Sequence, residues 1–202
     1  MQIDSVHDIQ KVYRELLQCM ARPGRIADIR ESAAKADFVR ECHPATFLVI
    51  QSVLDAEVTF HVLGDRSDAI RRKIADYTFA AHASAGEADY IIAPAGTFEQ
   101  ELLDAMRACK AGTLENPHQS ATWIIESEAL EGTAELKLSG PGIRDEADAP
   151  IALSEGLVSA RNMKTQEFPT GIDLIFTDGD GRISCIPRTT AISAKEESAW
   201  VM

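Results

Sequence analysis

The chain has 202 residues, of which 45% are hydrophobic and 26% are charged, as in an ordinary soluble globular protein. Its net charge of −12 argues against general binding of nucleic acids or of an anionic membrane surface, since both require a basic face. The first residues, MQIDSVHDIQ, lack the basic start of a signal peptide, and no stretch approaches the roughly 18 apolar residues of a membrane helix. We therefore expect a cytoplasmic protein with neither a nucleic-acid nor a membrane partner.

The four cysteines do not form a metal-binding or redox motif. No two of them stand in a CxxC pair, which excludes the usual zinc-knuckle and thioredoxin-type patterns. Free thiols are the expected state of such cysteines in the cytoplasm. The residues are Cys19, Cys42, Cys109 and Cys185.

The N-terminal part of the chain is predicted to contain two helices. In residues 5–21 the apolar residues Val6, Ile9, Tyr13, Leu16, Leu17 and Met20 recur at helical spacing and define one face. Ser5 is the expected N-cap, and RPG at 22–24 ends this helix, because proline cannot continue it. Residues 44–55, PATFLVIQSVLD, predict a second helix that begins at Pro44 and is apolar on most sides, as core helices are.

Strands and helices then alternate along the chain. Strands are expected at 57–63, 89–94, 121–127 and 133–140, with EALEG as the turn between the last two, and helices at 67–76, 97–109 and 154–165. Ser67 or Asp68 is expected to cap the first of these helices, and Thr97 the second, with Glu99 in its first turn. The order predicts an α/β fold with a mixed sheet, built as a single domain over 1–190 with a C-terminal tail at 191–202.

Residues 168–190, FPTGIDLIFTDGDGRISCIPRTT, predict a β-hairpin with additional features at both ends. DGDG at 178–181 fits a turn better than a calcium loop, because a strand follows where such a loop needs its bidentate glutamate. The closing CIPRTT leaves two interpretations open. Arg188, Thr189 and Thr190 could hold a phosphate or a partner's carboxylate, or the threonines could only cap the exit of the chain from the sheet.

A glycine loop, SGPGIR at 139–144, is a second candidate for anion binding. Backbone amides beside Gly140 and Gly142 could face an anion, and Arg144 could add charge-assisted hydrogen bonds. A tight turn before the acidic stretch RDEADAP is the alternative. The histidines lack metal-site spacing and no GxSxG motif is present, so the sequence predicts neither a metal site nor a catalytic residue.

Four segments together resemble the H subunit of bacterial carbon–phosphorus lyase, the phosphonate-utilisation complex. They are RELLQCMARPGRI at 14–26, AGTLENPHQSATWII at 111–125, LKLSGPGI at 136–143 and the hairpin sequence at 168–190. Their order matches that family and they span nearly the whole chain. The most specific element is Pro-x-Gly-Ile-Asp-Leu followed by Ile-Pro-Arg-Thr-Thr.

The resemblance implies a three-layer α/β/α fold similar to a shortened pyridoxal-phosphate-dependent transferase, without its cofactor. It implies a homodimer that joins the G, I and J subunits in a core complex. That complex supports formation of ribose 1-phosphonate 5-triphosphate from ATP and an alkylphosphonate. No complete active site is expected in this chain itself.

Within that assignment, the two ends of the hairpin are the expected surface for a partner or an anion. This surface comprises Gly171 and Asp173 at the start of the hairpin and Arg188, Thr189 and Thr190 at its end. A stand-alone pyridoxal-phosphate enzyme is an alternative, although its Schiff-base lysine is missing from 165–190 and from the 139–150 loop. A small-anion binding module is another.

Overall fold

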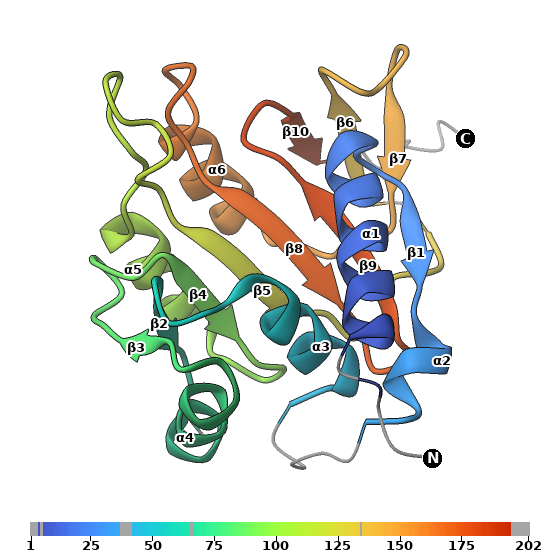
Figure 1. Ribbon diagram of the computed structural model, residues 1–202. Helices are drawn as coiled ribbons and strands as arrows, with labels where there is room; N and C mark the ends of the chain where they lie inside the picture. The colour runs from blue at the N-terminus through green and yellow to red at the C-terminus, as the bar shows by residue number, and fades with distance from the viewer. Residues whose placement is uncertain (1–3, 5, 37–41, 65–66, 134, 195–202) are drawn as a thin grey trace.

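The computed structural model describes residues 4, 6–36, 42–64, 67–133 and 135–194, which form a seven-stranded sheet, a three-stranded sheet and six helices (Figure 1). The strand order is β1-β9-β8-β5-β4-β2-β3 in the large sheet and β10-β6-β7 in the small one. In chain order the elements are α1 (His7–Ala21), β1 (Ile26–Asp28), α2 (Arg30–Ala33), α3 (Pro44–Val53), β2 (Thr59–Val62), α4 (Ser67–Thr78), β3 (Ala81–His82), β4 (Tyr90–Ala93), α5 (Glu99–Ala108), β5 (Thr122–Glu126), β6 (Leu136–Ser139), β7 (Ala147–Ala149), α6 (Glu155–Lys164), β8 (Asp173–Thr177), β9 (Arg182–Ile186) and β10 (Ala191–Ala194).

The large sheet is mixed, as the alternation of strands and helices predicts. Strands β3, β2, β4, β5 and β8 pair in parallel, whereas β9 runs antiparallel to both of its neighbours, β8 and β1. Helices α4, α5 and α6 lie in the sequence between β2 and β3, between β4 and β5, and between β5 and β8, whereas residues 83–89 join β3 to β4 without a helix. Each of these connections crosses from one end of the sheet to the other. The parallel strands therefore begin at one edge, here the amino edge, and end at the opposite, carboxyl edge.

The two faces of the sheet carry separate hydrophobic cores. Successive side chains of a strand point to opposite faces, so Ile124 of β5 joins the core beneath α1, α3 and α4. Its neighbours Trp123 and Ile125 join the core beneath α5 and α6, together with residues of the small sheet. The result is a three-layer α/β/α arrangement (Figure 1).

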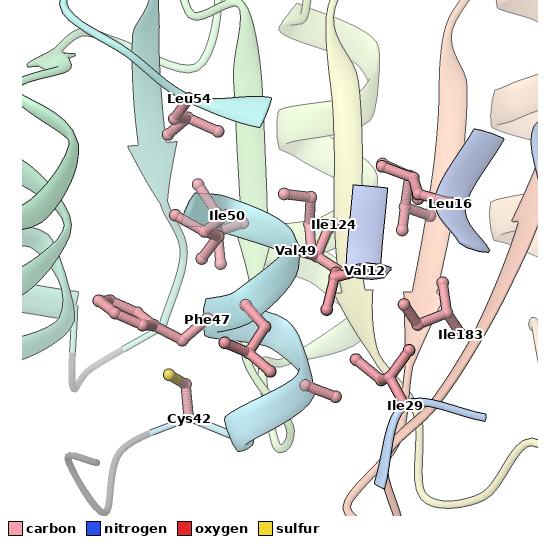
Figure 2. Close-up of a cluster of buried hydrophobic side chains, with 14 of the residues drawn as sticks. Val12, Leu16, Ile29, Cys42, Phe47, Val49, Ile50, Leu54, Ile124 and Ile183 are labelled. Atoms are coloured by element: carbon pink, nitrogen blue, oxygen red, sulfur yellow. The ribbon is translucent and has the colours of Figure 1, made fainter. Parts of the chain in front are cut away.

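Figure 2 shows how the first core is filled. Side chains of α3, including Phe47 and Ile50, and of α1, including Val12 and Leu16, lie against the large sheet. Helix α3 begins at Pro44 as predicted, and every residue from 45 to 50 is buried. A helix covered on so many sides gains its stability from packing, which is why its sequence is apolar almost all round.

Helix α1 packs against the core with part of the face predicted for it: Leu16 is buried, and Ile9 and Met20 are partly buried against the core. Its buried residues are Asp8, Val12, Leu16 and Cys19, which form one stripe at 100° per residue. The prediction was wrong for its other three residues, Val6, Tyr13 and Leu17, which are exposed by 69%, 43% and 48%. Asp8 can occupy the buried stripe because its carboxylate accepts hydrogen bonds from Lys35 and Ser32, and the bond from Lys35 lowers the pKa of Asp8.

The cap expected for α5 is wrong, whereas the caps expected for α1 and α4 involve residues outside the described part. Thr97 does not cap α5, because its hydroxyl donates to the carbonyl of Pro94, and the N-cap position is Phe98. Glu99 lies in the first turn as predicted. At α1 the Asp4 carboxylate accepts from the amides of Val6 and His7, whereas Ser5 lies outside the described residues. The residues before Ser67, the first residue of α4, lie outside them as well.

The sequence did not predict the small sheet as a unit, nor the short elements β1, α2 and β3, although β6 lies within the strand expected at 133–140. Strand β6 was expected to follow β5 through a turn, but it pairs with β7 and β10 in the second sheet. Strand β7 lies in the stretch expected to be an acidic loop. Strand β10 lies in the stretch assigned to the tail at 191–202, so the folded chain extends at least to residue 194. Residues 195–202 lie outside the described part.

Two further expectations concern the chain as a whole. All four cysteines are buried, and no disulfide joins any two of them. Within the described residues, no helix has both the length and the apolar character needed to cross a membrane.

Candidate functional site

The two ends of the β8–β9 hairpin meet at the amino edge of the sheet. Asp173 begins β8, and Arg188 follows the end of β9, where Leu174 pairs with Ile186. The Asp173 carboxylate accepts from the backbone amide of Arg188 at 2.8 Å and from its Nε at 3.1 Å, with Nη2 donating to the same oxygen as Nε. This bidentate pair closes the hairpin and fixes the start of residues 187–190, here called the corner.

The remaining contacts of Arg188 are also internal. Its Nη1 donates to the carbonyl of Pro117 at 2.6 Å, which joins the 111–120 loop to the corner. A Cβ added to Gly171 would lie 3.0 Å from that of Arg188 and 2.8 Å from Cγ2 of Thr165, so the chain here is packed too closely for a side chain. Within the folded chain, the carboxylate held by Arg188 is thus that of Asp173.

The glycine loop at 139–144 packs against the same corner. Gly140 has φ +132°, and a Cβ there would lie 2.8 Å from the carbonyl oxygen of Thr189. Gly142 has φ +85° and its α-carbon faces the carbonyl of Ala21, at the end of α1. The loop is a tight turn closed by a hydrogen bond from the Ile143 amide to the Gly140 carbonyl. These contacts favour the turn interpretation of the loop, and Arg144 is exposed.

Replacing Gly140 with alanine should lower the free energy of unfolding by about 2 kcal/mol, because it adds both an unfavourable φ and a contact with a backbone oxygen. Gly132 is the matched control, since its φ is +105° and nothing lies within 4 Å of an added Cβ. Urea unfolding of both variants should give the larger loss for Gly140→Ala. Equal losses of stability in the two variants would mean that a side chain at position 140 does not clash with the corner.

The corner therefore collects the segments that carry the family resemblance. Besides the contacts above, the Gly171 amide donates to the carbonyl of Ala111 at 2.8 Å. The segments at 111–125, 136–143 and 168–190 are far apart in the sequence, and each contributes to this one place. In Figure 1 the loops at 110–118 and 165–172 both reach the amino edge of the sheet.

Arg161 of α6 is the functional candidate that sequence reasoning missed. It is 1% exposed, and its Nη1 and Nη2 donate at 2.7 Å to the carbonyls of Thr190 and Pro187, the two ends of the corner. Its position in the sequence could have indicated its burial, because Arg161 stands four residues after Leu157 and three after Val158, on the buried face of the helix. Burial lowers the pKa of Arg161 to about 10, so the guanidinium remains charged at neutral pH.

A cavity of about 280 Å³ opens between α6 and the corner. Its polar lining consists of Arg161, Asn162, Thr165, Arg188, Thr189 and Thr190. None of the described residues that line it is acidic. The structure thus brings three of the predicted candidates, Arg188, Thr189 and Thr190, to one cavity, whereas Asp173 and Gly171 lie behind it as supports for Arg188.

A second cavity, of about 440 Å³, lies at the carboxyl edge, where open α/β sheets usually bind ligands. Its lining is apolar with several carboxylates, including Glu128, Glu131 and Glu135. Glu126 at the end of β5 also borders it, but this carboxylate is 8% exposed and accepts hydrogen bonds from α3 and from the loop after β4. The charge of this cavity disfavours an anionic ligand.

The DGDG turn is structural. Oδ1 of Asp178 accepts from the amides of Asp180 and Arg182, and its Oδ2 accepts from the amide of Leu130. These bonds confirm the turn interpretation of the two aspartates. Across the described ranges, no three His, Cys, Asp or Glu side chains are grouped so as to hold a metal ion.

A model of the family described as bacterial phosphonate metabolism protein (PhnH) matches residues 2–193. The chain belongs to the PhnH family. This confirms the resemblance inferred from the four sequence segments. A PhnH relative from Rhizobium meliloti (strain 1021), "Alpha-D-ribose 1-methylphosphonate 5-triphosphate synthase subunit PhnH", is 31% identical over 192 residues, covering 94% of this chain and 92% of the relative. A protein of Stutzerimonas stutzeri, "Putative C-P lyase subunit protein HtxG", is 28% identical over 191 residues, covering 92% and 86%.

Proposed function

We propose that this protein is a subunit of a carbon–phosphorus lyase complex in phosphonate catabolism. In that role it supports the formation of ribose 1-phosphonate 5-triphosphate from ATP and an alkylphosphonate. The observation that carries the proposal is the similarity, over 94% of the chain, to a relative named as a subunit of the synthase for the methylphosphonate product. The second relative, named as a C-P lyase subunit, supports the same complex.

The subunit role includes a cytoplasmic homodimer that joins the G, I and J subunits and contributes no complete active site of its own. The internal use of Arg188 supports this role, because its donors serve Asp173 and Pro117 and build the corner. The three layers around a mixed sheet support a fold similar to a shortened pyridoxal-phosphate-dependent transferase that works without the cofactor.

Co-expression with affinity-tagged G, I and J subunits tests the proposal directly. We expect the chain to co-purify with them, and we expect ATP and methylphosphonate to be converted to the triphosphate product when it is present. Omitting the chain should abolish or strongly reduce that conversion. If the other subunits assemble and react equally well without it, the proposed role is wrong.

Light scattering of the isolated chain tests the homodimer. The expected mass is about twice the 22.0 kDa of one chain at micromolar concentration. A mass of one chain over that range would contradict the dimer and leave the test of the complex unaffected. An absorbance spectrum of the same sample should show no band beyond that of the aromatic residues.

A further inference from the structure

The cavity beside the corner contains a buried positive charge that no carboxylate neutralises directly. The partners of the Arg161 guanidinium are the neutral carbonyls of Pro187 and Thr190 and, at 3.4 Å, the amide oxygen of Asn162. No carboxylate among the described residues forms an ion pair with it. Asp173, which acts on Arg161 from a distance, is already paired with Arg188. A charge buried in this way is costly unless an anion approaches it.

Two buried polar atoms at the same place have no hydrogen-bond partner among the described residues. They are Nε of Arg161 and the hydroxyl oxygen of Thr190, both in residues only 1% exposed. Buried donors are nearly always satisfied in native proteins, because an unmade hydrogen bond costs roughly 1–3 kcal/mol. The two orphaned atoms belong to two residues that line one cavity, which suggests that a ligand supplies the missing partner.

The charge of the cavity is unusual for this protein. The chain as a whole carries −12, and the carboxyl-edge cavity is lined by glutamates, yet the cavity beside the corner combines two arginines with three threonines and no acidic residue. Threonine hydroxyls and a guanidinium can each donate to an oxygen anion. The Arg188 guanidinium and the Thr165 hydroxyl already donate within the chain, so the donors that face a ligand are Nε of Arg161 and the hydroxyls of Thr189 and Thr190. These donors, arranged around one concave site, fit a ligand with several acceptor oxygens.

We propose that the cavity between α6 and the corner binds a tetrahedral oxyanion of the phosphate or phosphonate class. The charge of Arg161 and the hydroxyl of Thr190 are its principal recognition groups, and the exposed Thr189 lies at the mouth. The biological role of this site rests on the proposed function, since both reactants of the proposed synthase step carry such groups. The binding itself is a property of the isolated chain.

Titration calorimetry of the purified chain with inorganic phosphate, methylphosphonate and ATP tests the site, with acetate as the control anion. We expect saturable binding of at least one tetrahedral oxyanion and at least tenfold weaker binding of acetate. Tighter binding of methylphosphonate would assign the cavity to the phosphonate, and tighter binding of ATP would assign it to a nucleotide phosphate. No saturable binding of any of the three would overturn the proposal.

Thr190→Val separates recognition from folding. Valine keeps the shape of threonine and removes a hydroxyl that has no partner in the fold, so stability should be unchanged or slightly higher. Oxyanion affinity should fall at least tenfold. Thr78→Val is the matched control, because Thr78 is also buried but its hydroxyl donates to the carbonyl of Ile74, away from the cavity. This control should lose stability and keep its affinity.

Arg161→Lys keeps the charge but cannot serve both carbonyls of the corner with the same geometry, so it should bind the oxyanion more weakly and melt at a lower temperature. Unchanged affinity in Thr190→Val would overturn the proposal even if Arg161→Lys fails to fold. If the wild-type chain does not bind an oxyanion but still co-purifies with the partner subunits, the oxyanion site is wrong and the proposed function stands. If the wild-type chain does not co-purify with them, the proposed function is contradicted.

Discussion

Glu126→Ala is expected to lower the free energy of unfolding by about 4 kcal/mol, among the largest losses available from one substitution in this protein. The carboxylate is 8% exposed. Its Oε1 accepts from the His43 amide and the Thr46 hydroxyl, both at 2.6 Å, and its Oε2 accepts from the Ala95 amide at 2.9 Å. Alanine would leave these donors without their acceptor.

The position of Glu126 explains why the loss is large. It ends β5, faces the first turn of α3 and reaches the loop that follows β4, so one side chain joins three elements at the carboxyl edge. A negative charge also stabilises the amino end of a helix. The Thr46 hydroxyl continues this network to that of Thr177 at 2.8 Å.

Guanidinium chloride unfolding of Glu126→Ala, Glu126→Gln and Glu128→Ala provides the measurement. The glutamine variant retains one oxygen acceptor and should lose about half as much as the alanine variant, or about 2 kcal/mol. Glu128 is exposed two residues further on, and its replacement should change stability by less than about 0.5 kcal/mol. A loss below 1 kcal/mol for Glu126→Ala would show that the network contributes little.

The sequence predicts five strands of the large sheet, β2, β4, β5, β8 and β9, because their patterns are local, whereas the short edge strands β1 and β3 were not predicted. The alternation in 57–63, the apolar run in 44–55 and the turn residues of 178–181 each indicate one structure, and the observed elements agree within a few residues. Their three-layer assembly follows from helices that must cross between parallel strands. Here local preference and global fold are consistent.

The small sheet could not be predicted in this way. Strands β7 and β10 are three and four residues long, with the sequences ADA and AISA, and such stretches have little strand signal of their own. They are strands because β6 lies between them and provides hydrogen-bond partners on both sides. This is tertiary context, which no window of the sequence contains.

The candidate site was predicted in part, for a related reason. The hairpin implies that Asp173 and Arg188 approach each other, because Asp173 begins β8 and Arg188 follows the end of β9, but the sequence left open whether Arg188 holds an external group. Arg161 was missed because an arginine in a helix is ordinarily solvent-exposed. Its burial depends on how the 187–190 turn lies over α6, which is again a long-range contact.

Asp173→Ala is expected to lower the free energy of unfolding by about 3 kcal/mol, since removing one partner of a largely buried ion pair leaves the other charge uncompensated. The two side chains are only 20% and 19% exposed. The loss extends beyond the pair, because Asp173 also accepts from the Arg188 amide and holds the guanidinium where it donates to Pro117. Without it, Arg188 and Arg161 would both remain near the cavity with no ion-pair partner among the described residues.

Asp28 provides a control, because it forms a pair with Arg30 of similar geometry to the Asp173–Arg188 pair but without the burial. Its carboxylate accepts from Nε of Arg30 at 2.9 Å and from Nη2 at 2.5 Å, much as Asp173 accepts from Arg188, but these side chains are 50% and 63% exposed. Asp28→Ala should therefore cost no more than about 1 kcal/mol, because water screens an exposed pair. Both variants are compared by urea unfolding at low and high salt. Added salt should reduce the small loss at Asp28 and leave most of the loss at Asp173. Equal losses would mean that the pair acts as a surface ion pair and that the corner is held by its backbone contacts.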